Sequence, residues 1–157
     1  MSEDSNGWVS RRVSALRHGT VIDHLNPGTA LKAHRALAVP ATALVAIGIN
    51  LESTKLGHKD IIKIEDVELG QQELNKLALI SPNATLSVIR DYEVVQKFSI
   101  EMPDEFVGIV QCANPACVTR HEDVATRFRV ELRDPTRLRC HYCERVFRPD
   151  ELEFLAR

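Results

Sequence analysis

The sequence of 157 residues has few aromatic side chains, little net charge and no long apolar run. Aromatic residues make up 5% of the chain, too few to predict a surface on which nucleic-acid bases stack. No apolar run reaches the roughly 18 residues that a membrane-spanning helix needs. The formal net charge of −2 provides no general attraction for nucleic acids. The composition therefore argues against an integral membrane protein and against a general nucleic-acid-binding protein.

Signals for export, standard phosphate loops and catalytic motifs are also missing. The first ten residues, MSEDSNGWVS, are polar and contain no apolar segment typical of a secretory signal. We therefore expect a cytoplasmic protein, in which thiols stay reduced. Neither Gly-x-x-x-x-Gly-Lys nor Gly-x-Gly-x-x-Gly occurs, so the two standard phosphate-binding loops are absent. No serine, cysteine or carboxylate pair forms a recognisable catalytic arrangement, and no catalytic residue is predicted.

Lysine and cysteine divide the chain into two regions. Every lysine precedes position 98, whereas all four cysteines lie between positions 112 and 143. The polar segment 99–105, SIEMPDE, separates the two regions, and its Pro103 interrupts regular structure. The sequence therefore predicts two domains, over residues 10–100 and 105–155.

The first domain alternates strand and helix patterns. One helix is predicted to begin at residues 27–29 and to continue to Ala38, and a second covers 71–80, with Leu74, Leu77 and Ala78 on one face. Runs that predict strands cover residues 20–25, 42–51, 58–66, 84–90 and 92–98. The order β-α-β-β-α-β with a further strand predicts an α+β domain of the ferredoxin-like, split βαβ type.

The second domain is predicted to be a small all-β zinc ribbon. Residues 126–133 alternate apolar and charged side chains, which is typical of a half-buried strand. The segment is too short to be stable by hydrophobic burial alone, so it needs a further constraint. The spacing Cys112-x4-Cys117 and Cys140-x2-Cys143 favours four thiolates around one structural Zn²⁺ per chain.

Two other uses of the cysteines are weaker hypotheses. Two disulfides are disfavoured because no secretory signal accompanies the chain, and redox chemistry has still less support. With four sulfur ligands no position stays open for water or substrate, which argues against a zinc enzyme. His121 and His141 lie near the cysteines in sequence, but we expect them to be ordinary surface residues.

The arginines of the second domain leave two interpretations open. Residues 112–148 contain eight Arg against five Asp or Glu. Zinc ribbons with such an excess often bind nucleic acid. The alternative is an arginine-rich strand face that is solvated or contacts a protein partner.

Several charged residues of the first domain are predicted to lie near one another. Lys59 and Lys63 share a face of one strand, and Asp23 and His24 end another. Tyr92 and Lys97 lie near the end of the sheet. Lysine and histidine suit phosphates, and aspartate suits ribose hydroxyls. These residues alone do not distinguish a nucleotide pocket from ordinary surface charges.

The sequence resembles the regulatory chains of aspartate carbamoyltransferase over about residues 13–148. Several blocks occur in the expected order and carry the resemblance: Gly19–His24 (GTVIDH), Lys59–Glu65 (KDIIKIE), Leu77–Leu79 (LAL), Pro82, Tyr92–Val95 (YEVV), Lys97 and the four-cysteine spacing. The resemblance implies a non-catalytic regulatory subunit of pyrimidine biosynthesis. Its N-terminal domain would bind ATP, CTP and UTP with Mg²⁺ as allosteric effectors, and its zinc domain would contact the catalytic chain.

The resemblance also implies partners and residue roles. Homodimers of regulatory chains would link catalytic trimers into a six-plus-six complex, with no nucleic-acid or membrane partner. Residues expected to bind nucleotide are Val13, Leu16, Asp23, His24, Lys63, Tyr92, Val94 and Lys97. Residues expected to contact the catalytic chain are Asn114, Arg133, Tyr142 and Glu144.

Within the nucleotide site, Asp23 is expected at the ribose, and His24 and Lys97 at the phosphates. Lys63 is expected at the ribose or at a second nucleotide. The chain departs from the family pattern at Ser14 near the base and at Ala116 in the first cysteine turn, and the segment between Arg133 and Cys140 is one residue shorter.

Overall fold

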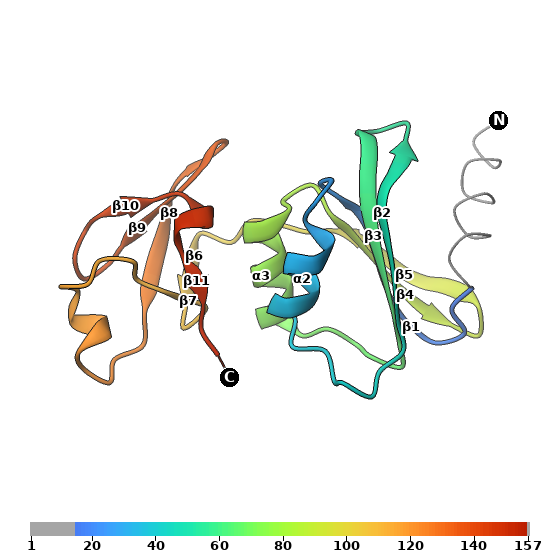
Figure 1. Cartoon of the computed structure of the whole chain (residues 1–157), viewed down its shortest axis with the longest axis horizontal. Coiled ribbons are helices and arrows are strands. Elements are labelled where there is room, and N and C mark those ends of the chain that lie inside the picture. Colours follow the sequence, from blue (N-terminus) through green and yellow to red (C-terminus); the bar gives the residue numbers. More distant parts are fainter. Residues whose placement is uncertain (1–14, 157) are drawn as a thin grey trace.

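The computed structural model describes residues 15–156, and its N-terminal half has the predicted order of helices and strands (Figure 1). These elements are β1 (Gly19–Leu25), α2 (Ala30–Ala36), β2 (Val45–Ser53), β3 (Gly57–Glu65), α3 (Gln71–Ile80), β4 (Thr85–Arg90) and β5 (Glu93–Ser99). Within the described residues, no helix is long and apolar enough to cross a membrane.

The strands of this half form one antiparallel sheet in the order β2-β3-β1-β4-β5. Both helices of residues 15–156 cover the same face of the sheet (Figure 1). The opposite face, which carries no helix of these described residues, is called the helix-free face. Ile22 of β1 lies opposite Ile62 of β3 and Leu86 of β4. All three side chains are buried in the core beneath the helices.

Most predicted boundaries differ from the structure by one to three residues, and two of these differences have a clear physical cause. The strand expected from residue 42 begins at Val45, because residues 40–43 form a turn in which the N–H of Ala43 donates to the carbonyl of Pro40 (2.9 Å). The first helix ends at Ala36, because Ala38 has a φ of 50°, which a right-handed helix cannot contain.

Asp60 holds three segments together from inside the first domain. Its carboxylate is fully buried and accepts the main-chain N–H groups of Gly28 (2.9 Å), Ala30 (3.1 Å) and Asn50 (2.8 Å). The first two belong to the start of α2, whose own N-cap side chain makes no capping hydrogen bond. A residue of β3 therefore satisfies the helix start that a local cap would ordinarily satisfy.

The C-terminal half consists of short strands around a second core. Its elements are β6 (Glu105–Val107), β7 (Val110–Gln111), η1 (Val118–Arg120), β8 (Arg127–Arg133), β9 (Thr136–Cys140), β10 (Val146–Phe147), η2 (Pro149–Glu151) and β11 (Glu153–Phe154). One sheet has the order β10-β9-β8-β6, and β11 pairs with β7. The core combines large side chains such as Phe106 and Phe128 with the cysteines.

The predicted alternation of β8 holds only over its first part. Phe128 is fully buried and Val130 packs against the core, but Leu132 is 49% exposed. The pairing of β8 with β9 shifts register between Val130 and Leu132, and this irregularity turns Leu132 away from the core.

The two cores meet at a few apolar side chains. Met102 and Phe154 each pack against both cores, and Leu79 of α3 belongs to the second core. Arg133 fixes the connecting segment, because it donates to the carbonyl of Met102 (2.7 Å) and forms an ion pair with Asp104. The halves are therefore in apolar contact in addition to their covalent link.

Gly19 provides a test of the sheet. Its φ is +143°, and a Cβ built there would lie 2.1 Å from the carbonyl oxygen of Ile64. We expect Gly19→Ala to lower the free energy of unfolding by more than about 2 kcal/mol, measured by urea denaturation. Gly57→Ala is the matched control, because Gly57 also has a positive φ but open space around it. Equal losses of unfolding free energy in the two variants would show that the close approach of Gly19 to β3 is not the cause.

Candidate functional site

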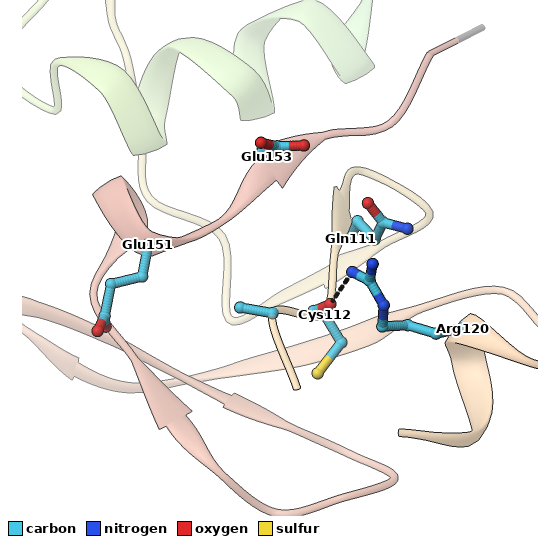
Figure 2. Close-up of a pocket in the computed structure, with 6 residues that line it drawn as sticks. Gln111, Cys112, Arg120, Glu151 and Glu153 are labelled. Atoms are coloured by element: carbon cyan, nitrogen blue, oxygen red, sulfur yellow. Dashed lines mark hydrogen bonds between the residues drawn. The ribbon is translucent and has the colours of Figure 1, made fainter. Parts of the chain in front are cut away.

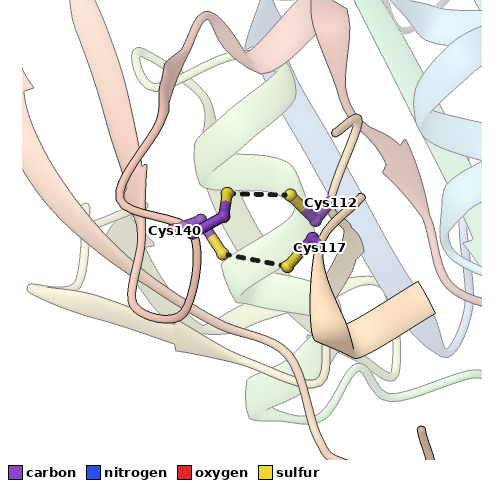
Figure 3. A group of neighbouring side chains, drawn as sticks. Cys112, Cys117 and Cys140 are labelled. Carbon is purple, nitrogen blue, oxygen red and sulfur yellow. Dashed lines mark hydrogen bonds between the residues drawn. The ribbon is translucent and has the colours of Figure 1, made fainter. Parts of the chain in front are cut away.

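The four cysteines meet at one point of the second half, as their spacing predicts. Their sulfur atoms all lie within 4.8 Å of one another. The Sγ atoms of Cys112 and Cys143 are 3.7 Å apart, and those of Cys117 and Cys140 are 3.8 Å apart (Figure 3). A tetrahedral site with metal–sulfur bonds of about 2.3 Å has sulfur–sulfur edges of about 3.8 Å. These distances fit a metal site and are far longer than the roughly 2 Å of a disulfide.

The electrostatics of the cluster also favour a bound cation. Burial raises the pKa of Cys112 and Cys140, since a thiolate is costly in an apolar core. Main-chain N–H groups offset part of this cost: that of Asn114 donates to the sulfur of Cys112, and those of Tyr142 and Cys143 donate to the sulfur of Cys140. A divalent cation would supply the remaining compensation, and the four sulfurs would occupy all its tetrahedral positions.

Residues next to the cysteines shape the two turns and do not join the cluster. Asn114 is buried, and its side-chain oxygen accepts the N–H of Ala116 (3.1 Å). His121 contacts the carbonyl of Pro115 (2.7 Å), and the His141 ring stacks edge-on against Tyr142. Within the described residues the metal-ligand group contains only cysteines, in agreement with the surface roles expected for both histidines.

A polar pocket lies beside the first cysteine turn (Figure 2). It has a volume of about 240 Å³ and is lined by Gln111, Cys112, Ala113, Arg120, Glu151 and Glu153. Arg120 donates to the carbonyl of Cys112 (2.9 Å), and Glu151 accepts the N–H of Arg148 (2.6 Å). The contact of Arg120 supports the turn that carries Cys112, whereas that of Glu151 caps the start of η2.

Most arginines of β8 and β9 have acidic partners within the chain, whereas Arg137 donates to the carbonyl of Thr136. Arg127 pairs with Glu105 (3.0 Å), and Arg139 pairs with Glu131 through two hydrogen bonds (3.0 and 2.9 Å). Arg133 pairs with Asp104. This internal pairing favours a structural role for the arginine-rich face over nucleic-acid binding.

Two of the residues expected at the catalytic chain lie together. Tyr142 is 41% exposed, and the exposed Glu144 follows it in the turn between Cys140 and β10. Arg133 lies at the connecting segment instead, and Asn114 is only 8% exposed. Tyr142, Glu144 and Arg133 are therefore accessible, and Asn114 is the least accessible of the four.

The helix-free face of the first sheet carries a row of charged and polar residues. Val21 of β1 lies opposite Lys63 of β3 and Ser87 of β4, and Ser87 lies opposite Lys97 of β5. Residues directly opposite one another in antiparallel strands share a face. Lys63 and Lys97 therefore lie on the same face, with β1 and β4 between them.

Asp23 and His24 lie at the end of β1 beside this row. Asp23 forms an ion pair with the buried Lys59 (2.9 Å) and accepts the N–H of His24 (2.7 Å). The Nδ1 atom of His24 lies 2.9 Å from the hydroxyl of Thr85. His24 has a φ of 56°, and the β1–β3 register shifts between Ile22 and Leu25.

On this face the protonated forms of two basic residues, His24 and Lys63, are disfavoured. Burial lowers the pKa of His24; the charge of Asp23 opposes the shift, and those of Lys59, Lys55 and Lys97 add to it. Burial also lowers the pKa of Lys63, and Asp23 again opposes the shift. A bound anion would stabilise the protonated forms of both.

Of the residues expected at a base, Val94 lies farther along the same face, opposite Ile89 of β4, and Tyr92 lies in the turn before β5. Tyr92 is 65% exposed and Val94 is 58% exposed. The N–H of Tyr92 donates to the carbonyl of Arg17 (3.0 Å), which places the half-buried Leu16 close by along the chain. Val13 and Ser14 lie outside the described residues.

Thr85 and Lys55 were not among the residues singled out from the sequence. Thr85 lies opposite Asp23 in the ladder, which becomes visible only once the pairing of β1 with β4 is known. Lys55 lies in the turn after β2 and affects His24 through the fold rather than through sequence proximity. Neither carries a motif that could have identified it.

The fold and the cysteine centre define a two-domain, metal-binding α+β protein whose four-sulfur site leaves no position for a substrate. The family models for the aspartate carbamoyltransferase regulatory chain match it in succession: the allosteric domain over residues 11–101 and the metal binding domain over residues 104–153. The chain belongs to the family of aspartate carbamoyltransferase regulatory chains, and it is a regulatory rather than a catalytic subunit.

Curated relatives with this name match over almost their whole length. The chain from Pyrococcus abyssi is 47% identical over 144 residues, covering 90% of this chain and 95% of the relative. That from Thermococcus gammatolerans is 48% identical over 143 residues, with the same coverage of 90% and 95%. That from Methanopyrus kandleri is 43% identical over 152 residues, covering 95% and 97%.

The cysteine centre predicts that Cys140→Ser loses its metal and unfolds the second half, because that core is built around the four sulfurs. The first sheet, with its own core, should stay folded. Metal content and segment-resolved hydrogen exchange measure the two effects, with His141→Ala as the control beside the same ligand. Full metal content in Cys140→Ser, with unchanged protection of β8 and β9, would overturn this account.

Proposed function

We propose that this chain binds nucleoside triphosphates on the helix-free sheet face and transmits their effect to a catalytic chain of aspartate carbamoyltransferase in pyrimidine biosynthesis. The effectors are ATP, CTP and UTP, with Mg²⁺ accompanying UTP. The observation that carries this proposal is the grouping of Asp23, His24 and Lys97 around one end of β1. The grouping offers cations for phosphates and a carboxylate for a ribose.

The proposed binding mode follows the two ends of this face. His24 and Lys97 bind the phosphates, Asp23 binds the ribose, and Lys63 binds the ribose or a second nucleotide. The base lies toward Tyr92 and Val94, with the main chain of 13–16 around it. Exposed apolar side chains at one end and cations at the other support this orientation.

The metal in this proposal is one structural Zn²⁺ per chain. Four thiolates at tetrahedral spacing are the donor set that zinc prefers in structural sites. The ion would hold the two cysteine turns together and supply no chemistry to a substrate. Cys112, Cys117, Cys140 and Cys143 are its ligands.

The zinc-bound half is the proposed contact surface for the catalytic chain. Tyr142 and Glu144 supply accessible contacts, Arg133 contributes from the connecting segment, and Asn114 acts through the first turn. We interpret this half, over residues 105–155, as a zinc ribbon. The first half, over residues 10–100, is interpreted as a ferredoxin-like domain with an added strand, and the strand order supports this interpretation.

Regulatory chains are proposed to pair as homodimers within a cytoplasmic six-plus-six complex. The outer edge of β2 supports a dimer, because no strand of residues 15–156 pairs with it. Leu44 and Ile49 are exposed along this edge, at 62% and 51%. A long edge strand with apolar side chains favours pairing with another chain.

Lys97→Ala tests the phosphate site. ATP and CTP carry the same triphosphate group. The variant should therefore lower the binding affinity for each nucleotide by about tenfold in calorimetric titrations of the metal-loaded chain. Lys32→Ala is the control, because Lys32 is exposed on α2 on the other face of the sheet. Unchanged affinity for either nucleotide would refute the assigned role.

The lowered pKa of His24 predicts proton uptake on binding. The free histidine is neutral near pH 7, and an adjacent phosphate raises its pKa, so CTP affinity should rise as the pH falls toward about 6. Titrations in buffers of different ionisation enthalpy measure the uptake. His24→Gln should bind CTP with less proton uptake. Protonation of the nucleotide itself contributes to both proteins, so the difference between them reports the proton taken up by His24. Equal uptake in both proteins would exclude phosphate contact at His24.

A further inference from the structure

The β2–β3 hairpin extends past the end of the strand beside it. Pairing of β3 with β1 stops at Asp60 opposite Leu25, whereas pairing with β2 continues to Gly57 opposite Ser53. The three further residues of β3 extend the hairpin by roughly 10 Å. Figure 1 shows this hairpin projecting beyond the rest of the sheet.

Lys55 occupies the tip of this hairpin, in the turn between Ser53 and Gly57. The part of the hairpin that extends past β1 begins at Leu25, the residue after His24. The hairpin tip therefore lies beyond the end of β1 that carries His24. The charge of Lys55 acts on His24 together with those of Lys59 and Lys97, so all three ammonium groups lie within electrostatic range of one imidazole.

The three lysines differ in whether their charge is neutralised. Lys59 is buried and paired with Asp23 (2.9 Å). Among residues 15–156, no carboxylate forms an ion pair with Lys55 or Lys97. These two approach His24 from opposite sides of β1, one from the β3 side and one from β5 beyond β4. Unneutralised cations on both sides of a histidine form a site for a polyanion.

We propose that Lys55 is a further phosphate-binding residue of the effector site and that it favours nucleotides with more phosphate groups. This inference rests on the proposed function. Lys55 is exposed and lies on a turn, so its flexible stem is free to follow the outermost phosphate. Its contribution should therefore be greatest for a triphosphate and absent for a monophosphate.

The test compares CTP, CDP and CMP on the full metal-loaded chain and on Lys55→Gln. We expect Lys55→Gln to weaken CTP by about fivefold to tenfold, to weaken CDP less and to leave CMP unchanged. Lys55→Arg should restore most of the CTP affinity, because it keeps the charge. Lys32→Gln is the control for a lost exposed charge elsewhere.

The outcomes separate this inference from the proposed function. If the unmodified chain binds none of the three nucleotides, the proposed function fails, and the role of Lys55 fails with it. If the unmodified chain binds CTP but Lys55→Gln keeps the same ratio of CTP to CMP affinity, only the role of Lys55 is overturned. An equal loss for all three nucleotides in Lys55→Gln would also overturn it, because the effect would then not depend on phosphate number.

Discussion

The meeting of four cysteine sulfurs at one point is the constraint on which the C-terminal half depends. Its strands are mostly two or three residues long, and such strands are not stable by themselves. Three of the four cysteines are buried in the core beside Phe106 and Phe128, so the sulfur cluster and the apolar core are a single unit. That core also includes Leu79 of α3, so the part of the structure that depends on the sulfur cluster reaches a helix of the first half.

The N-terminal half has a different physical requirement, because it keeps several cations close together on an open sheet face. Asp23 neutralises Lys59, but His24 and Lys63 are held where their charged forms are disfavoured. In the proposed mechanism a nucleotide supplies additional negative charge, and it regulates only through different affinities for two states of the complex. Coupling of this kind is typically about 1–3 kcal/mol. The contact of Arg133 with the connecting segment and the apolar contacts of Met102 and Phe154 are the physical links between the halves.

The sequence was sufficient to predict the element order of the N-terminal half, the bounds of α3 and the four-cysteine group, because each depends on local periodicity or spacing. It could not predict β7 or β11, since strands of two residues carry no periodic signal. The exposure of Leu132 depends on a register shift relative to β9, and the burial of Asp60 depends on contacts with α2 and β2. The surroundings of His24 likewise depend on which strands are neighbours, which is why Thr85 and Lys55 carried no sequence signal.

Reconstitution with a catalytic chain of aspartate carbamoyltransferase tests the central claim most directly. Aspartate saturation would be measured for the catalytic chain alone and after assembly with the metal-loaded chain, each with and without CTP or ATP. The account predicts that nucleotides shift the saturation curve only in the assembled complex. A complex that contains this chain but has the same curve with and without every nucleotide would contradict it, as would a nucleotide effect of equal size on the catalytic chain alone.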